Sequence, residues 1–154
     1  MNFNLKSPSS YREWREYFLF RYKILRKPIG LHRSTIRDKI EKISYHVMAT
    51  NNKGKIIGVG RLHFINAKES QIRYMAVDKK FRKKGVGSTI VKNLEMHSVN
   101  NYRNKIILNA RENAVKFYSK LGYVNFGKVD VGIDIKHYQM KKILKIVLPG
   151  TNNS

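Results

Sequence analysis

The residues that most clearly suggest chemistry form a basic, glycine-containing loop. Residues 77–88 read VDKKFRKKGVGS, in which five of the twelve side chains are cationic. The segment SQIRYMAV before the loop has the pattern of a strand, and helical periodicity begins near Gly85. A helix N-terminus offers about four unpaired N–H groups and a partial positive charge, and Gly85 and Gly87 leave its backbone accessible. The loop is therefore predicted to bind a phosphate-bearing ligand.

Two widespread phosphate-binding loops do not fit these residues. A P-loop has the pattern G-x-x-x-x-G-K-[ST], whereas a single residue separates Gly85 from Gly87. The dinucleotide-binding pattern G-x-G-x-x-G would place a further glycine where Ile90 stands, and it needs a tighter turn between strand and helix.

The loop instead resembles the pyrophosphate loop of the GNAT N-acetyltransferase superfamily, whose pattern is Gln or Arg, two variable residues, Gly, one variable residue, then Gly or Ala. Arg82, Gly85 and Gly87 match this pattern between a strand ending in MAV and a helix opening with GVGSTIVKNL. A second segment, ARENAVKFYSKLGY, is similar to the family's Ala-x-x-Phe/Leu-Tyr-x-x-Leu-Gly-Phe motif through Ala114, Phe117, Tyr118, Leu121, Gly122 and Tyr123. The chain thus resembles a small, single-domain bacterial member.

The resemblance implies acetyl-coenzyme A (acetyl-CoA) as co-substrate, lying where the parallel strands SQIRYMAV and KIILNA diverge. Strand backbone would pair with the pantetheine arm, and amides of Lys83 to Ser88 would hold the pyrophosphate. The implied contacts are Met75, Ala76, Val77, Arg82, Lys83, Lys84, Gly85, Val86, Gly87, Ser88, Asn109, Arg111, Asn113 and Phe117. Arg111 replaces an asparagine that many members carry. Asn109 or Asn113 could take over that polar contact, or Arg111 could reach a coenzyme phosphate.

The reaction implied by the resemblance is direct transfer of acetyl from the thioester to an amine. Tyr118 falls on the family's tyrosine and is expected to protonate the departing thiolate as the general acid. An ammonium group, with a pKa of about 10.4, must first lose a proton. His63, Glu69, His137 or a water chain could accept that proton, and no metal is expected.

The predicted fold is α/β with a mixed central sheet in the order β-α-α-β-β-β-α-β-α-β-β. A first strand is expected over Asn2–Lys6, a first helix after a cap at Ser9 or Ser10, and a second helix over Ser34–Lys42. The apolar residues that recur at helical spacing in these two helices are Trp14, Phe18, Leu19, Tyr22 and Leu25, then Ile36, Ile40 and Ile43. Residues 1–147 are predicted to form one domain, and residues 148–154 a disordered tail.

Composition narrows the class of protein. The chain has 154 residues, no cysteine and 42% hydrophobic residues, so a disulfide framework and a cysteine nucleophile are excluded. No apolar run reaches the length of a membrane span and the N-terminus lacks a signal-peptide core, so a cytoplasmic location is expected. The net charge of +22 favours anionic partners and opposes self-association, although a monomer and a homodimer both remain open.

Two alternative functions follow from that charge. One is a nucleic-acid or ribosome-associated binder on the same fold, which would need aromatic side chains interleaved with cations on an exposed face. The tyrosine-rich first helix makes this possible, although its periodicity favours a core role. The other is an acyltransferase that uses an acyl carrier protein, whose acidic surface suits the charge.

The amine acceptor is less defined. The resemblance implies that the first helix and the loop after it shape the acceptor pocket. The segment LRKPIG, Leu25–Gly30, lies where the predicted helix ends and this loop begins. A cationic acceptor would require carboxylates to converge, and Glu69, Asp130 and Asp134 are the candidates.

Overall fold

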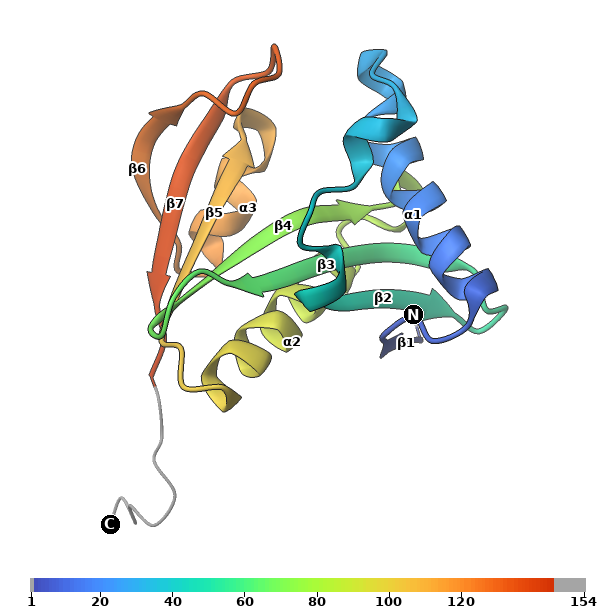
Figure 1. The fold of residues 1–154 in the computed structure, drawn as a ribbon, viewed down its shortest axis with the longest axis horizontal. Helices are drawn as coiled ribbons and strands as arrows, with labels where there is room; N and C mark the ends of the chain where they lie inside the picture. Colours follow the sequence, from blue (N-terminus) through green and yellow to red (C-terminus); the bar gives the residue numbers. More distant parts are fainter. Residues whose placement is uncertain (1, 146–154) are drawn as a thin grey trace. The chain divides into compact units, whose positions relative to one another are not determined.

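A computed structural model describes residues 2–145, which form a mixed α/β fold (Figure 1). The strands are β1 (Phe3–Lys6), β2 (Tyr45–Asn51), β3 (Ile56–Phe64), β4 (Glu69–Val77), β5 (Lys105–Arg111), β6 (Val124–Val129) and β7 (His137–Ile143). The α-helices are α1 (Tyr11–Leu25), α2 (Val86–Asn100) and α3 (Val115–Lys120). The strands form a mixed sheet in the order β1-β2-β3-β4-β5-β7-β6. The predicted fold class, α/β with a mixed central sheet, is confirmed. No helix within the described residues has both the length and the apolar character needed to cross a membrane.

The chain divides into two compact units. Unit 1 runs to His63 and includes Ile72–Leu94, while unit 2 comprises Phe64–Gln71 and the chain from Glu95 onward. β4 and α2 therefore contribute residues to both units. The prediction of a single domain over residues 1–147 stays a prediction, and the tail predicted for residues 148–154 lies outside the described residues.

The start of α1 in unit 1 is set by a local signal in the sequence. The Ser10 hydroxyl accepts a hydrogen bond from the Glu13 N–H at 3.1 Å, and the Glu13 carboxylate accepts one from the Ser10 N–H at 3.3 Å. This reciprocal capping box satisfies two amides that the first helical turn would otherwise leave unpaired. The helix then packs on the antiparallel strands β2 and β3.

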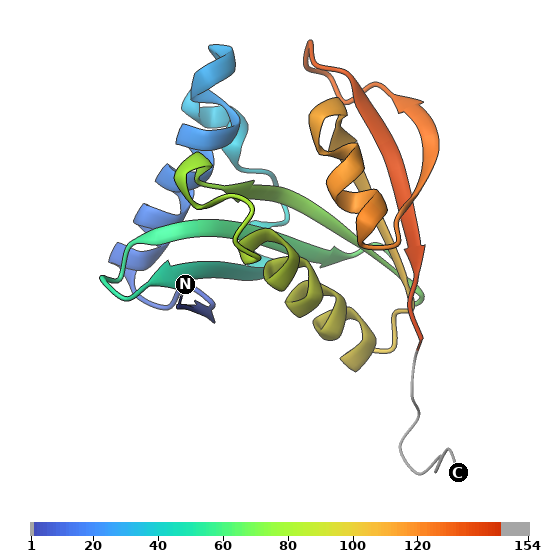
Figure 2. The same cartoon turned by 180° about the vertical axis from the view of Figure 1, so that it is seen from behind.

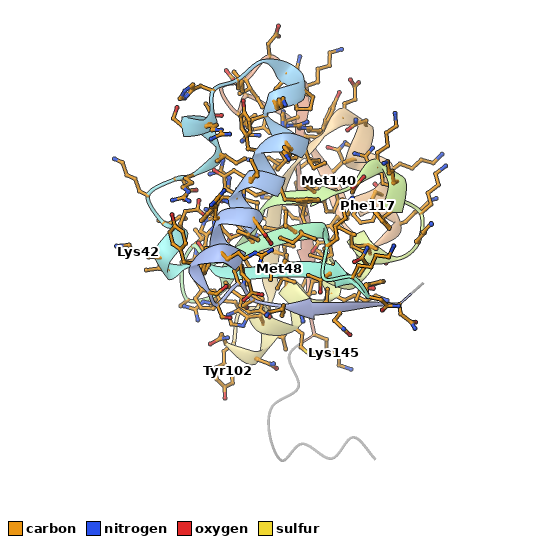
Figure 3. All side chains as sticks on the ribbon, turned by 90° about the vertical axis from the view of Figure 1, so that its right-hand side faces the viewer. Lys42, Met48, Tyr102, Phe117, Met140 and Lys145 are labelled. Carbon is orange, nitrogen blue, oxygen red and sulfur yellow. The ribbon has the colours of Figure 1, made fainter. Side chains whose placement is uncertain are left out.

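The two helices of unit 1 cover opposite faces of β3. Val59 and Met48, which is labelled in Figure 3, pack against Tyr17 of α1. The neighbouring glycines point to the other face, where a Cβ on Gly60 would lie 2.8 Å from a methyl group of Ile90 in α2. A side chain there would push the helix away, so the glycines let α2 lie close to the β3 backbone (Figure 2).

Unit 2 is built on the antiparallel strands β5, β7 and β6. α3 ends at Lys120 and Leu121 caps it, and Gly122 follows with a φ of +94°, a left-handed conformation that favours glycine at a helix end. The Tyr123 hydroxyl donates to the Glu95 carboxylate at 2.9 Å, and the Lys142 ammonium lies 3.0 Å from the same carboxylate. These contacts connect the end of α2 to β7.

The second helix predicted over Ser34–Lys42 is wrong. The chain forms separate 3-10 turns at Lys27–Ile29, Arg33–Ile36 and Glu41–Ile43 instead. The Glu41 carboxylate accepts from the Asp38 N–H at 3.0 Å, and the Asp38 carboxylate from the Ile40 N–H at 3.1 Å. Such local bonds compete with a continuous helix. Ile36 is buried as predicted, whereas Ile43 is 77% exposed.

The face of α1 that is most deeply buried also differs from the predicted one. Tyr17 and Arg21 are completely buried, while Trp14, Phe18 and Tyr22 are only half-buried. Burial of an arginine cannot be read from apolar periodicity, because it requires carboxylate partners that come from distant parts of the chain.

Candidate functional site

The turn that enters α2 has an unusual backbone. Lys83 has a φ of +61° and Gly85 a φ of +81°, so two left-handed residues lie just before the helix begins at Val86. A Cβ added to Gly85 would meet no atom of residues 2–145 within 4 Å, so these residues leave open space beside it. Arg82, Lys83 and Lys84 are all exposed around the turn.

The first turn of α2 leaves its amides available. The hydroxyls of Ser88 and Thr89 donate to the Gly85 carbonyl, at 3.1 and 2.6 Å, and therefore do not cap the helix. The Thr89 N–H bonds to the same carbonyl at 3.0 Å, so the preceding amides belong to the group that a helix cannot satisfy internally. The first turn contains no acidic residue. This arrangement suits an anion, and phosphate binding at Gly85 and Gly87 stays a prediction.

The end of β4 lies next to this turn in unit 1. Ala76 is buried in the core beside α1, and the built Cβ of Gly60 would approach the Met75 sulfur, so these neighbours face opposite sides. The Val77 carbonyl accepts a hydrogen bond from Arg82 Nε at 3.3 Å. Arg82, which was predicted as a cofactor contact, thus also ties the turn to the strand. The structure brings these predicted cofactor residues together.

Tyr74 gives β4 a local irregularity that the sequence did not reveal. Its φ of +55° is rare for a bulky residue within a strand and marks strain at this position. The ring is buried and is surrounded by guanidinium groups, whose central carbons lie 4.1 Å (Arg21), 4.9 Å (Arg61) and 4.7 Å (Arg73) from its centroid. Contacts between cations and the aromatic face hold the side chain in place.

Two carboxylates balance these guanidinium groups. Asp38 binds Arg61 through both oxygens, at 2.7 and 2.8 Å, and Glu41 lies 3.0 Å from both Arg61 and Arg21. Burial opposes ionisation of Asp38, but the hydrogen bonds and charge of Arg61 outweigh it and lower its pKa to about 2. Burial likewise opposes ionisation of Glu41, yet Arg21 and other donors lower its pKa. Both carboxylates are thus charged and poor proton acceptors at neutral pH.

His63 lies at the edge of this cluster. Its Nδ1 is 3.4 Å from an Arg61 nitrogen. Burial, followed by the charge of Arg61, lowers the pKa of His63 to about 4. The imidazole is therefore neutral at pH 7, and because the guanidinium of Arg61 can only donate, Nδ1 accepts and Nε2 carries the hydrogen, which makes His63 a weak base.

Unit 2 contains the predicted acid, Tyr118, on α3. The side chain is buried, its ring makes edge contacts with Phe117 and Tyr123 at centroid distances of 5.0 and 5.7 Å, and burial raises its pKa. The phenol is therefore protonated at neutral pH. Phe117 itself is 37% exposed, and Asn113 is exposed in the turn before the helix.

Asn109, on β5, carries a polar atom with no partner. Its side-chain oxygen is buried and accepts no hydrogen bond from any of the residues that the structure describes. Such an acceptor is costly unless a ligand supplies a donor. Arg111, two residues on, is half-buried, and burial lowers the pKa of its guanidinium. Asn109 is therefore the unit 2 residue that best fits a ligand contact.

The remaining base candidates also lie in unit 2. Glu69 is the first residue of β4 rather than part of the preceding loop, and its carbonyl accepts from the Ile65 N–H at 2.9 Å. His137 begins β7 opposite Arg111 and is buried. Its Nδ1 lies 2.7 Å from the Ile135 carbonyl, so this nitrogen donates and Nε2 is left as the possible acceptor. Asp130, one of the proposed acceptor carboxylates, accepts from the Gly132 N–H within its own turn.

Comparison with known proteins gives a consistent result. A family model described as an acetyltransferase (GNAT) domain matches residues 28–144. The chain is 34% identical over 106 residues to the uncharacterized N-acetyltransferase YjcF of Bacillus subtilis strain 168. The aligned segment covers 68% of this chain and 74% of the relative. It also superposes on a GNAT-family acetyltransferase from Staphylococcus aureus Mu50 with a TM-score of 0.79 at 20% identity, covering 94% of this chain and 100% of the other. An aminoglycoside 6'-N-acetyltransferase solved with coenzyme A has a TM-score of 0.75 at 15% identity. The superposition covers 93% of this chain and 97% of the other. At these identities the two structures establish the fold.

Proposed function

Because the chain belongs to the GNAT acetyltransferase family and is therefore an acyltransferase, we propose that it transfers acetyl from acetyl-CoA directly to a primary amine of a small molecule or protein. The observation that best supports this proposal is the turn before α2. It presents unpaired amides of a helix, three exposed cations and open space at Gly85, all suited to the diphosphate of the coenzyme.

The remaining proposed contacts are with the pantetheine arm and the diphosphate of the coenzyme. Backbone groups of Met75, Ala76 and Val77 would pair with the pantetheine arm. The side-chain oxygen of Asn109 would accept a hydrogen bond from an amide N–H of that arm, which would satisfy the acceptor that is otherwise buried without a donor. Lys83 to Ser88 would hold the diphosphate through backbone amides. Arg111, Asn113 and Phe117 complete the proposed contacts on unit 2.

The proposed reaction forms one bond and breaks another. The neutral amine attacks the thioester carbonyl carbon, and a tetrahedral intermediate forms with negative charge on oxygen. A backbone N–H near Val77 would stabilise that oxyanion. Collapse of the intermediate breaks the carbon–sulfur bond, the electron pair leaves on sulfur, and the thiolate then takes up a proton.

Tyr118 is the proposed donor of that proton. Burial raises the pKa of its phenol, so the proton is present throughout the range in which the enzyme would work. A thiol has a pKa of about 8.5, so transfer from a phenol is slightly uphill in water. Burial would disfavour the charged thiolate as it disfavours the charged phenolate, so both pKa values rise and the transfer stays uphill.

The proton of the amine needs a separate acceptor. Asp38 and Glu41 are unsuitable because their arginine partners lower the pKa of each carboxylate. His63 is neutral at pH 7 but has a pKa of about 4, so it would pass a proton onward rather than store it. We therefore favour a water chain that ends at His63, with Glu69 and His137 as the remaining candidates.

A matched pair of glycine variants tests the proposed diphosphate site. Gly85 and Gly54 both have positive φ values, +81° and +74°, and a Cβ on either meets nothing within 4 Å among the residues that the structure describes. Changing either one to Glu should therefore cost a similar backbone strain, about 1–2 kcal/mol. Only Gly85→Glu places a negative charge where the diphosphate would bind, so it should weaken coenzyme A binding roughly 100-fold.

Isothermal titration with coenzyme A and with pantetheine, which lacks the diphosphate, measures this effect. We expect Gly54→Glu to bind coenzyme A like the parent chain, and both variants to bind pantetheine alike. Equal coenzyme A affinity in Gly85→Glu and the parent chain would refute the assignment of the turn. A coenzyme A-release screen over classes of amine would then identify the acceptor.

A further inference from the structure

A groove runs along one side of α1 in unit 1. It has a volume of about 610 Å³ and is bounded by the helix and by the 3-10 turn Arg33–Ile36. Its aromatic side chains are Tyr11, Trp14, Phe18 and Tyr22, spaced three or four residues apart along the helix. Over these residues the helix rises about 16 Å, so the groove presents a row of rings rather than a single pocket.

The rings are not a covered core. Tyr11 is 84% exposed, and Phe18 and Tyr22 are half-buried. Trp14 and Phe18 stack with their centroids 5.7 Å apart and their planes 25° from parallel. The apolar stripe predicted from helical periodicity therefore forms a partly open aromatic surface.

Cations are interleaved with these rings. The groove is lined by Arg15, Arg33 and Arg37, and the Arg37 guanidinium lies 3.7 Å above the centroid of Phe18. Among the residues that the structure describes, no carboxylate lines the groove. The nearby acids of the helix are engaged elsewhere, since Glu13 pairs with Lys6 and Glu16 with Arg12.

We propose that this groove binds a single-stranded nucleic acid. The exposed ring of Tyr11 and the partly open rings beside it offer surfaces on which bases can stack, and adjacent arginines neutralise the phosphates. This combination binds single strands without strict sequence preference. Arginine suits this role because its planar group can both stack and bind phosphate through paired donors. The net charge of +22 adds long-range attraction. None of the residues that line the groove is among the proposed cofactor or catalytic residues.

Charge argues against a second copy of the chain as the occupant. In a symmetric dimer the same surface meets itself, so Arg15, Arg33 and Arg37 would face identical arginines with no carboxylate between them. An acidic peptide would satisfy the charges but would not use the aromatic faces. The experiment must therefore separate stacking from simple charge attraction.

Trp14 provides a direct signal, because it is the only tryptophan of the chain and lies in the groove. Titrating the full chain with a twelve-nucleotide single-stranded RNA should quench its fluorescence, since a stacked base alters the indole's environment. A glutamate peptide of equal charge serves as comparison and should bind more weakly, without quenching. Saturating coenzyme A should not displace the RNA.

Two pairs of variants locate the contact. Tyr11→Ala should weaken RNA binding by about 5- to 150-fold, the effect of losing one stacked base. Its control is Tyr102→Ala, which removes an exposed tyrosine of unit 2 that projects from the fold in Figure 3 and should leave binding unchanged. Arg33→Ser should reduce the slope of log affinity against log salt by about 0.7, whereas Lys53→Ser, in the β2–β3 turn, should reduce it less.

Several results would overturn the proposal. They are no RNA binding at low salt, equal affinity for the glutamate peptide, RNA binding without a change in Trp14 fluorescence, and equal effects of Tyr11→Ala and Tyr102→Ala. All four tyrosine and charge variants change exposed residues, so coenzyme A binding should be unchanged in each. Measuring that binding therefore checks that each variant is folded.

Discussion

Replacing Asp38 with Asn tests how far the buried guanidinium groups of unit 1 depend on one carboxylate. Asp38 binds Arg61 at 2.7 and 2.8 Å and Arg73 at 3.0 Å. Arg61 is completely buried, so its charge cannot be solvated by water when a partner is lost. Asparagine keeps an acceptor oxygen but removes the negative charge. Glu41, 3.0 Å from Arg61, remains as one carboxylate partner.

We expect the free energy of unfolding at pH 7 to fall by about 2 kcal/mol. Removing one partner of a buried ion pair costs about 3–5 kcal/mol when the other charge is left alone, and Glu41 reduces that penalty. The lowering of the Asp38 pKa from 3.8 to about 2 independently corresponds to about 2 kcal/mol, and somewhat less after solvent screening of a side chain that is 23% exposed. For a chain of 154 residues the melting temperature should fall by roughly 4–8 °C.

The pH dependence of this effect has a definite sign. The pKa of Asp38 is lower in the folded chain than its ordinary value of 3.8. The charged carboxylate therefore stabilises the fold above about pH 4, and this contribution is lost as the pH falls toward 2. The parent chain should lose stability over that interval, and Asp38→Asn should lose about 2 kcal/mol less.

Urea unfolding at pH 7 and across a series from pH 5 to pH 2.5 measures both effects. Asp130→Asn is the matched control, because it makes the same substitution at an exposed turn residue and should change stability by less than about 0.5 kcal/mol. If Asp38→Asn and Asp130→Asn have the same stability at pH 7, the carboxylate does not support the buried cluster. The account of how the ring of Tyr74 is held would then also fail.

Two further predictions concern the acetyl-transfer site. Tyr118→Phe should lower turnover about 100-fold in a coenzyme A-release assay with little change in coenzyme A affinity, since only the proton donor is lost; unchanged turnover would mean that the residue serves packing alone. Asn109→Leu should leave the free energy of unfolding unchanged or raise it by about 1 kcal/mol, because a buried acceptor without a donor is removed. The same variant should weaken coenzyme A binding about tenfold by calorimetry, and full affinity would show that the Asn109 oxygen does not meet the ligand.

The basic turn and its neighbouring elements could be predicted because their signals are local. Gly85 and Gly87 follow an alternating strand pattern and precede a helical one, and the capping box of Ser10 and Glu13 fixes the start of α1. Strands, turns and helix ends depend on neighbours within a few residues. The sequence alone therefore determined the α/β class and the position of the basic turn between a strand and a helix.

Only the tertiary structure decided which groups surround Tyr74 and which face of α1 is open. Arg21, Asp38, Arg61 and Arg73 come from separate segments, and no spacing in the sequence shows that they meet. Helical periodicity identifies an apolar stripe but not the element that covers it, so the rings of Trp14, Phe18 and Tyr22 could be read as core. Long-range packing settles both questions, because burying a charge or leaving a ring exposed depends on contacts made across the fold.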